Sequence, residues 1–213
     1  MKVDIKEILR YLGYGRNKPD GETLALIDEC ISDLQKICEP KHVYRRFALK
    51  MPGHGRVKAG ILEMVSCSLE GNLKDCEEMI LFAATLGSGS DMLMNRYLHI
   101  AISKAAVFQA VAASAIEQYC NECQSIIANQ VKKEKLYLRP RFSPGYGDLS
   151  LAVQKDLLNA LDAQKIAGIF LSDSGMMMPE KSVTALIGLS RSNNRCQMNG
   201  CEVCGKKDCA YRR

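Results

Sequence analysis

The ten cysteines of this 213-residue chain are distributed unevenly, and their distribution limits its organisation more than any other feature. Four of them, Cys196, Cys201, Cys204 and Cys209, lie within the last 23 residues, and the other six are scattered. The charges divide at the same place, because residues 191–213 carry six basic and two acidic side chains, a net charge of +4. The first 190 residues hold 23 basic and 22 acidic side chains. We therefore predict a near-neutral domain over residues 1–190 and a Cys-rich basic tail over residues 191–213.

The body of the chain has the composition of an ordinary globular domain, with 47% apolar and 25% charged residues. No apolar run reaches the roughly 18 residues that a membrane span needs. The best candidate, residues 100–116, contains Lys104 and Gln109. Acidic residues stand near the N-terminus where a signal peptide needs an apolar core, so we expect a cytoplasmic protein with mostly reduced thiols. The near-zero charge of the body argues against nucleic acid as its partner.

Two hydrophobic periods alternate along the body. Apolar residues recur at helical spacing over residues 4–12, 24–38, 91–129 and 151–161. Alternating or continuous apolar runs typical of strands cover residues 43–49, 61–65, 79–86, 168–172 and 182–190. The sum predicts a single α+β domain with a mostly antiparallel sheet and one long central helix.

A rigid turn is the first candidate binding element. Two prolines and two glycines lie between Pro140 and Gly147, which restricts the backbone and holds the neighbouring side chains in place. Arg141 is suited to bidentate recognition of a carboxylate, and Tyr146 offers an aromatic face and a hydroxyl. The spacing alone favours the alternative, a structural turn that carries a surface arginine.

Glu117 is the second candidate, because it follows a stripe of alanines on the long predicted helix. Small side chains at Ala106, Ala110 and Ala113 would let a flat ligand or another backbone approach the helix. A carboxylate at the end of this stripe could accept hydrogen bonds from an amino group or a ribose hydroxyl. Tight helix packing with a solvated Glu117 is the alternative.

The tail contains the most specific local pattern, Cys-x4-Cys-x2-Cys-x4-Cys. Four thiolates this close together can hold a tetrahedral zinc or an iron–sulfur cluster, and Gly200 and Gly205 permit tight turns between them. A tail of free thiols is the alternative. The spacing predicts a metal site at Cys196, Cys201, Cys204 and Cys209, with zinc and iron both open.

Three stretches carry a resemblance to a known family. They are Arg141-Phe-Ser-Pro-Gly-Tyr-Gly-Asp-Leu, the helix ending Leu161-Asp-Ala, and the run Leu171-Ser-Asp-Ser-Gly-Met-Met-Met-Pro-Glu-Lys-Ser-Val-Thr-Ala-Leu-Ile-Gly. Together they resemble the activation, or reactivation, domain of cobalamin-dependent methionine synthase, in a stand-alone form. The chain departs from the fused form at Leu186 and Ile187, where that form has aromatic residues, and the Cys-rich tail is foreign to it.

The resemblance implies a helmet-like α+β domain that binds S-adenosylmethionine and supports reductive methylation of a corrinoid. Arg141 would bind the methionyl carboxylate, and the backbone from Ser143 through Pro144 to Gly145 would contact the adenosyl portion. Tyr146 would face the corrinoid, and Glu117 would match the family's ligand-binding acid. The chemistry belongs to the cofactors, so the protein needs no nucleophile or general base of its own.

The implied partner is a separate corrinoid protein, such as a methionine synthase without its own activation domain, because 213 residues cannot hold the corrinoid and substrate modules as well. The cobalamin would therefore belong to the partner, and an electron donor such as flavodoxin or ferredoxin would also be required. A function from another class remains open, in which the tail is a zinc-knuckle-like module that binds nucleic acid or protein.

Overall fold

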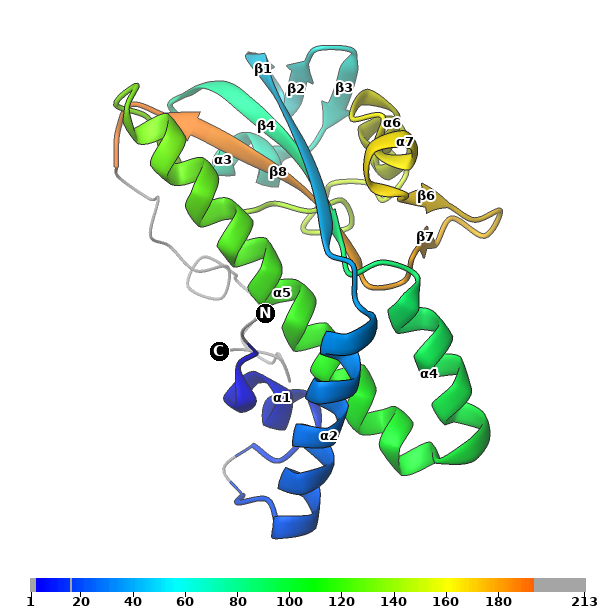
Figure 1. Cartoon of the computed structure of the whole chain (residues 1–213). Coiled ribbons are helices and arrows are strands. Elements are labelled where there is room, and N and C mark those ends of the chain that lie inside the picture. Colours follow the sequence, from blue (N-terminus) through cyan, green and yellow to red (C-terminus); the bar gives the residue numbers. More distant parts are fainter. Residues whose placement is uncertain (1–2, 16, 194–213) are drawn as a thin grey trace. The chain divides into compact units, whose positions relative to one another are not determined.

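The computed structural model describes residues 3–15 and 17–193. The four tail cysteines and their predicted metal site lie outside these residues. The elements are α1 (Ile5–Tyr11), α2 (Gly21–Ile37), β1 (Lys41–Gly53), β2 (Arg56–Ala59), β3 (Leu62–Val65), α3 (Cys67–Asn72), β4 (Cys76–Thr85), α4 (Gly89–Ile100), α5 (Ile102–Lys132), β5 (Tyr137–Leu138), α6 (Val153–Ala160), α7 (Ala163–Ala167), β6 (Phe170–Leu171), β7 (Met177–Met178) and β8 (Ser182–Ser190). Figure 1 traces this order. The α+β class with one long helix is confirmed.

The described chain forms two compact units. Of the described residues, the first unit contains 3–15, 17–43, 83–125 and 162–183, and the second contains 44–82, 126–161 and 184–193. In the first unit, α1 and α2 begin at Asp4 and Asp20, whose carboxylates accept hydrogen bonds from the amides of Lys6 (2.9 Å) and Thr23 (2.7 Å). Both aspartates are N-caps directly before the helices, and aspartate is among the residues preferred at this position.

The core of the first unit is the apolar face of α2 packed with α1 and the N-terminal half of α5. Ile27, Cys30 and Leu34 recur at helical spacing on α2, and each is fully buried. The Ser114 hydroxyl of α5 donates to the carbonyl of Asp4 at 3.2 Å, which ties α5 to the start of α1. Figure 1 shows α1 and α2 beside this part of α5.

The helix predicted over residues 91–129 is instead two helices. Ala101 leaves the helical conformation (φ −160°, ψ 82°), so α4 ends there and α5 begins at Ile102. Tertiary packing stabilises the corner, because the Tyr97 and Phe108 rings meet edge to face with centroids 5.4 Å apart. The sequence has neither glycine nor proline at the break, and the helical spacing resumes after one longer gap between Ala101 and Phe108, so the pattern favoured a single helix.

Most of the six-stranded sheet belongs to the second unit, and its strand order is β3-β2-β1-β4-β8-β5. The pairs β1–β2, β2–β3 and β5–β8 are antiparallel, with register partners that include Val57 and Met64. The predicted strands over residues 43–49, 61–65 and 79–86 are present with shifted ends, and the strand over residues 182–190 has the predicted bounds. In the described ranges, 3–15 and 17–193, no helix is both long and apolar enough to cross a membrane.

Short elements were missed by the hydrophobic pattern. The strand β2 has four residues, and α3 has six. The methionine-rich segment also contains β7, which pairs with β6 in a small hairpin through Phe170 and Met178. Windows this short contain too few positions for a period to be read.

Candidate functional site

The segment from Arg141 to Leu149 is a loop that is fixed at its start to the central sheet of the second unit. Phe142 and Leu186 exchange two backbone hydrogen bonds of 2.9 and 2.8 Å as an isolated antiparallel bridge. Leu186 and Ile187 of β8 are fully buried, so the aliphatic side chains at these positions belong to the core. The loop therefore begins from a rigid support.

The predicted turn is present within this loop. The amide of Tyr146 donates to the Ser143 carbonyl at 3.1 Å. Pro144 precedes Gly145, whose φ of +88° places it in the left-handed region, the arrangement typical of a type II turn. A Cβ at Gly145 would meet only a Leu151 methyl group at 3.6 Å, so the glycine is required for its conformation rather than for space.

The side chains of the loop divide into a buried and an exposed set. Pro144 is buried, and Arg141 and Ser143 are half-buried. Tyr146 is 60% exposed, and its ring meets Phe142 edge to face with centroids 6.4 Å apart. The loop thus presents an exposed aromatic surface, and the half-buried Arg141 lies on the same turn-forming segment.

The far end of the loop is anchored by Asp148, whose role the sequence did not reveal. Its carboxylate accepts hydrogen bonds from the Ser66 hydroxyl and from the amides of Cys67 (2.8 Å) and Ser68 (3.1 Å) at the start of α3. These bonds, that from Ser66 first, hold the pKa of Asp148 well below its usual range. Asp148 therefore adds a second cap to α3 and joins it to the loop.

Gly147 allows the same loop to approach α3 closely. Its φ is +55°, and a Cβ there would lie 2.7 Å from the Ser68 hydroxyl oxygen. The signal that could have revealed this contact is the Gly-Asp pair itself, because Asp in a turn often bonds to nearby backbone amides. Its partners are about 80 residues earlier in the chain, however, and no local pattern identifies them.

Arg139 lies two residues before Arg141 and has a different role. It is 1% exposed, and its guanidinium donates to the Lys74 carbonyl at 2.9 Å and approaches the Ser190 hydroxyl at 3.4 Å. The Ser190 hydroxyl in turn donates to the Asp75 carbonyl at 3.0 Å. These contacts tie the start of the loop segment to the turn before β4, so Arg139 is part of the support.

Glu117 lies on α5 in the first unit and is half-buried, whereas the loop belongs to the second unit. Its predicted role in binding stays a prediction. The alanine stripe before it is only partly interior, since Ala110 is buried, Ala113 is half-buried and Ala106 is exposed. Nothing in this burial pattern alone distinguishes a ligand surface from helix packing.

The cysteines of the described residues are free thiols: Cys30, Cys38, Cys67, Cys76, Cys120 and Cys123. Within the described residues, no group of three or more His, Cys, Asp or Glu side chains is placed to hold a metal ion. The predicted metal site of the tail lies outside these residues.

Comparison with known proteins supports the fold. No protein-family model matches the sequence, and no curated protein matches it. Among solved structures, the chain is similar to the crystal structure of the MetH reactivation domain bound to AdoHcy, with a TM-score of 0.62. The match covers 93% of this chain and 72% of that chain at 15% identity. At this identity the likeness establishes a shared fold, as the sequence resemblance led us to expect.

Proposed function

We propose that this chain binds S-adenosylmethionine and supports the reductive methylation of a corrinoid held by a separate cobalamin-dependent methyltransferase of the methionine synthase type. The observation that carries the proposal is the rigid loop from Arg141 to Leu149, fixed to β8 at one end and to α3 at the other. The similarity in fold to a reactivation domain whose structure contains AdoHcy adds support. AdoHcy differs from S-adenosylmethionine by the transferred methyl group.

This proposal assigns binding roles to several residues of the loop and to Glu117. Arg141 binds the methionyl carboxylate through its planar guanidinium. The amides of Gly145 and Tyr146 already donate to Leu149 and Ser143, so the backbone groups assigned to the adenosyl portion are the Ser143 amide and the Gly145 carbonyl. The exposed ring of Tyr146 faces the corrinoid, and Glu117 accepts from an amino or ribose group.

The partner's corrinoid would supply the chemistry: its cobalt would take one electron from the donor protein and then the methyl group of S-adenosylmethionine, and S-adenosylhomocysteine would be left. The chain's own residues orient the donor and limit access of water. The electron comes from a donor protein such as flavodoxin or ferredoxin, and the corrinoid comes from the partner. In this role the chain is a component of a cytoplasmic methyltransferase system.

Binding of S-adenosylmethionine is expected to raise the melting temperature of the protein. A ligand at 100 times its dissociation constant adds about 2.7 kcal/mol to the stability of the folded state, which corresponds to a rise of roughly 5–10 °C for a chain of this size. Differential scanning fluorimetry with millimolar ligand measures the shift. The Arg141→Ala variant should lose most of it, and Arg141→Lys should lose part, because lysine cannot form the bidentate contact.

The matched control is Arg56→Ala, which removes the same charge from an exposed position on β2. This variant should retain the full shift. The proposal is wrong if the wild-type protein shows no shift, or if Arg141→Ala keeps the wild-type shift while its melting temperature without ligand is unchanged.

For the tail we propose a bound metal at Cys196, Cys201, Cys204 and Cys209, on the strength of their spacing. Elemental analysis of anaerobically purified protein should find about one zinc ion or one iron–sulfur cluster per chain. The double variant Cys201→Ser/Cys204→Ser should lose it, whereas Cys67→Ser, which alters an exposed thiol of the body, should not. A wild-type metal content far below one per chain would show that these thiols are free.

A further inference from the structure

A pocket of about 380 Å³ lies within the first unit, between α2, α4 and the first turn of α5. Its volume is in the range of small-molecule sites, roughly 300–1,000 Å³. Its lining combines charged and apolar side chains: Asp33, Lys36, Ile37, Leu93, Arg96, Tyr97, Ile100 and Lys104. None of these residues belongs to the loop assigned above to S-adenosylmethionine.

Helical spacing brings the lining residues together. Leu93, Arg96, Tyr97 and Ile100 follow one another at steps of three, one and three along α4, so they share a face. Asp33, Lys36 and Ile37 do the same on α2, and Lys104 reaches in from α5. The pocket is therefore made by elements that the fold holds in contact.

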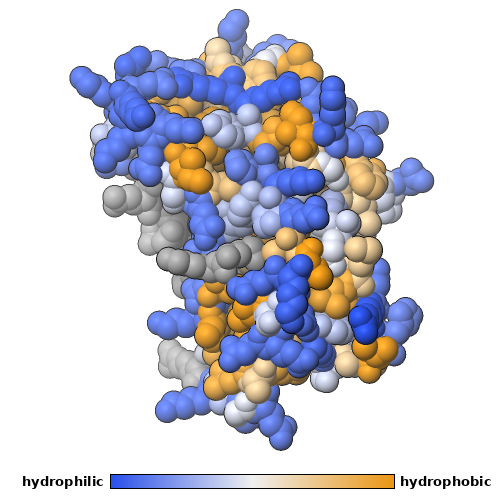
Figure 2. Space-filling view, in the orientation of Figure 1, coloured by the Kyte–Doolittle hydropathy of each residue, from blue (hydrophilic) through white to orange (hydrophobic). Residues whose placement is uncertain are grey.

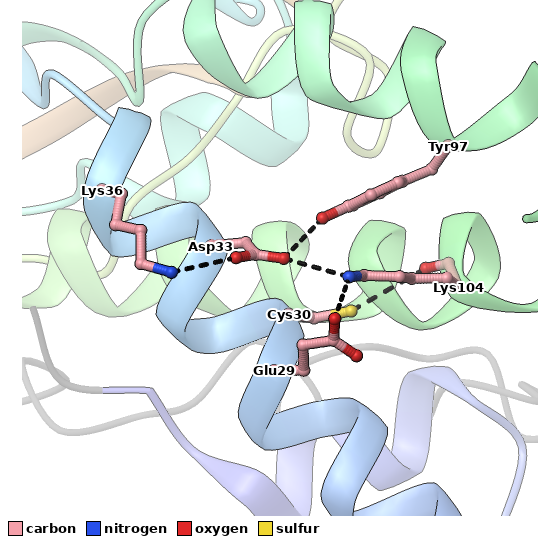
Figure 3. Close-up of polar contacts among 6 residues, drawn as sticks. All are labelled: Glu29, Cys30, Asp33, Lys36, Tyr97 and Lys104. Atoms are coloured by element: carbon pink, nitrogen blue, oxygen red, sulfur yellow. Dashed lines mark hydrogen bonds and ion pairs between the residues drawn. The ribbon is translucent and has the colours of Figure 1, made fainter. Parts of the chain in front are cut away.

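The negative charge of Asp33, in the wall of this pocket, is balanced by hydrogen bonds and ion pairs with its neighbours. One Asp33 oxygen accepts from the Tyr97 hydroxyl at 2.6 Å and from the Lys104 ammonium at 3.0 Å, and the other lies 3.3 Å from Lys36 (Figure 3). The hydrogen bonds from Tyr97 and then Lys104 lower the pKa of Asp33 to about 2. Asp33 is thus ionised, and each of its oxygens already has a partner.

The ammonium of Lys104 is bonded to acidic side chains of the pocket wall and is therefore not available to a ligand. Its ammonium also bonds Glu29 at 2.6 Å and sits 4.6 Å from the centre of the Tyr97 ring. Its side chain is 15% exposed, so the ammonium is held on several sides. Burial lowers the pKa of Lys104, but the hydrogen bonds to Glu29 and Asp33 outweigh it and keep the pKa above its usual value. Figure 3 shows these groups converging from α2, α4 and α5.

Two cations of the lining remain for a ligand. Within residues 3–15 and 17–193, the side chain of Arg96 makes no hydrogen bond or ion pair, and the residue is exposed at the pocket. Lys36 touches Asp33 only at 3.3 Å, and 67% of its side chain is exposed, so it is able to turn toward a ligand. The three cations of the lining, Lys36, Arg96 and Lys104, outnumber the two nearby carboxylates, Asp33 and Glu29. The pocket and its wall therefore carry a net charge of +1.

Three residues of the same lining are apolar. Leu93 and Ile37 are half-buried, and Ile100 is 66% exposed at the rim. In the space-filling view, hydrophobic surface lies among hydrophilic surface in the region of α4 (Figure 2). A ligand that fits this surface has an anionic head and an apolar body.

We propose that this pocket binds a small organic anion with one acidic head group, its carboxylate or phosphate lying between Arg96 and Lys36 and its apolar body against Ile37, Leu93 and Ile100. The head is recognised through charge-assisted hydrogen bonds, for which the arginine fork is well suited. Because both cations are exposed, added salt screens the attraction and weakens binding. The site is independent of the one proposed for S-adenosylmethionine.

The test uses benzoate and phenyl phosphate as carboxylate and phosphate probes, with benzamide as the neutral analogue of benzoate. Each is titrated into the full-length protein, and amide chemical shifts are followed by NMR. Residues 33–37 and 93–104 are expected to shift with the anions and not with benzamide. The anion that binds with the higher affinity identifies the preferred head group.

Two variants separate the contributions of charge and apolar contact. Arg96→Ala is expected to weaken benzoate binding about ten-fold or more, as expected for loss of a charged hydrogen bond, whereas Arg56→Ala leaves it unchanged. Ile100→Ala, at the exposed rim, should weaken benzoate and leave inorganic phosphate unaffected. Arg141→Ala should bind benzoate normally, and Arg96→Ala should keep the thermal shift with S-adenosylmethionine, so the two proposals fail separately.

Three outcomes would overturn the proposed anion site. One is an absence of shifts in residues 33–37 and 93–104 with both anions at tens of millimolar. A second is equal affinity for benzamide and benzoate. The third is an unchanged benzoate affinity in Arg96→Ala, in a protein whose remaining spectrum shows that it is folded.

Discussion

Replacing Arg139 with alanine is expected to lower the free energy of unfolding by about 3–5 kcal/mol, the range for removing a large buried side chain together with its hydrogen bonds. The guanidinium contacts the Lys74 carbonyl and the Ser190 hydroxyl, and its stem packs beside Gly188, where a Cβ would lie 3.1 Å from Cγ of Arg139. Alanine leaves both a cavity and a carbonyl without its donor. The melting temperature should fall by roughly 10 °C.

Two further variants make this experiment specific. Arg139→Met fills the volume of the arginine stem without its charge, so it should destabilise less than Arg139→Ala. Arg141→Ala should cost no more than about 1 kcal/mol, because Arg141 is only half-buried. An Arg139→Ala protein that melts within about 2 °C of the wild type would show that this arginine is not part of the support.

Alanine at Gly89 is expected to destabilise the first unit by about 1–3 kcal/mol or more, because the added methyl group has no room. Its Cβ would lie 2.4 Å from the carbonyl oxygen of Ile37, and a backbone atom cannot move aside as a side-chain tip can. The start of α4 would have to shift away from the end of α2. Urea unfolding, followed by circular dichroism, measures the change as a lower midpoint.

Gly21 provides a matched control, since it is also the first residue of a helix. A Cβ there meets nothing within 4 Å, and the position is exposed. Gly21→Ala should therefore be neutral or stabilising by up to about 1 kcal/mol, because alanine restricts the unfolded chain. Equal midpoints for the two variants would contradict the close approach of α4 to Ile37.

The sequence predicted those elements whose burial follows a regular period. The face of Ile27, Cys30 and Leu34 identified α2, and the continuous apolar run of β4 identified a buried strand. The break at Ala101 was not predictable, because it depends on the contact between Tyr97 and Phe108 rather than on a local breaker. Local periodicity reports which face is buried but not where tertiary contacts interrupt a helix.

The candidate site was predictable in part for the same reason. Pro144 and Gly145 encode a turn locally, and the structure contains it. The anchors were not predictable, because Asp148 and Arg139 bond to backbone and hydroxyl groups 51 to 82 residues away. Arginine is also a residue that is seldom fully buried, so its type argued for the surface. The assignments of Glu117 and the tail cysteines stay predictions.

The exposed ring of Tyr146 has an optical consequence. The chain contains no tryptophan, so its intrinsic fluorescence comes from tyrosine alone. A Tyr146→Trp variant would carry a single indole on the outer side of the turn, where 60% of the native residue is exposed and Phe142 supports it from one side. Any molecule that covers the turn would change the emission of that indole, against a background without other tryptophans.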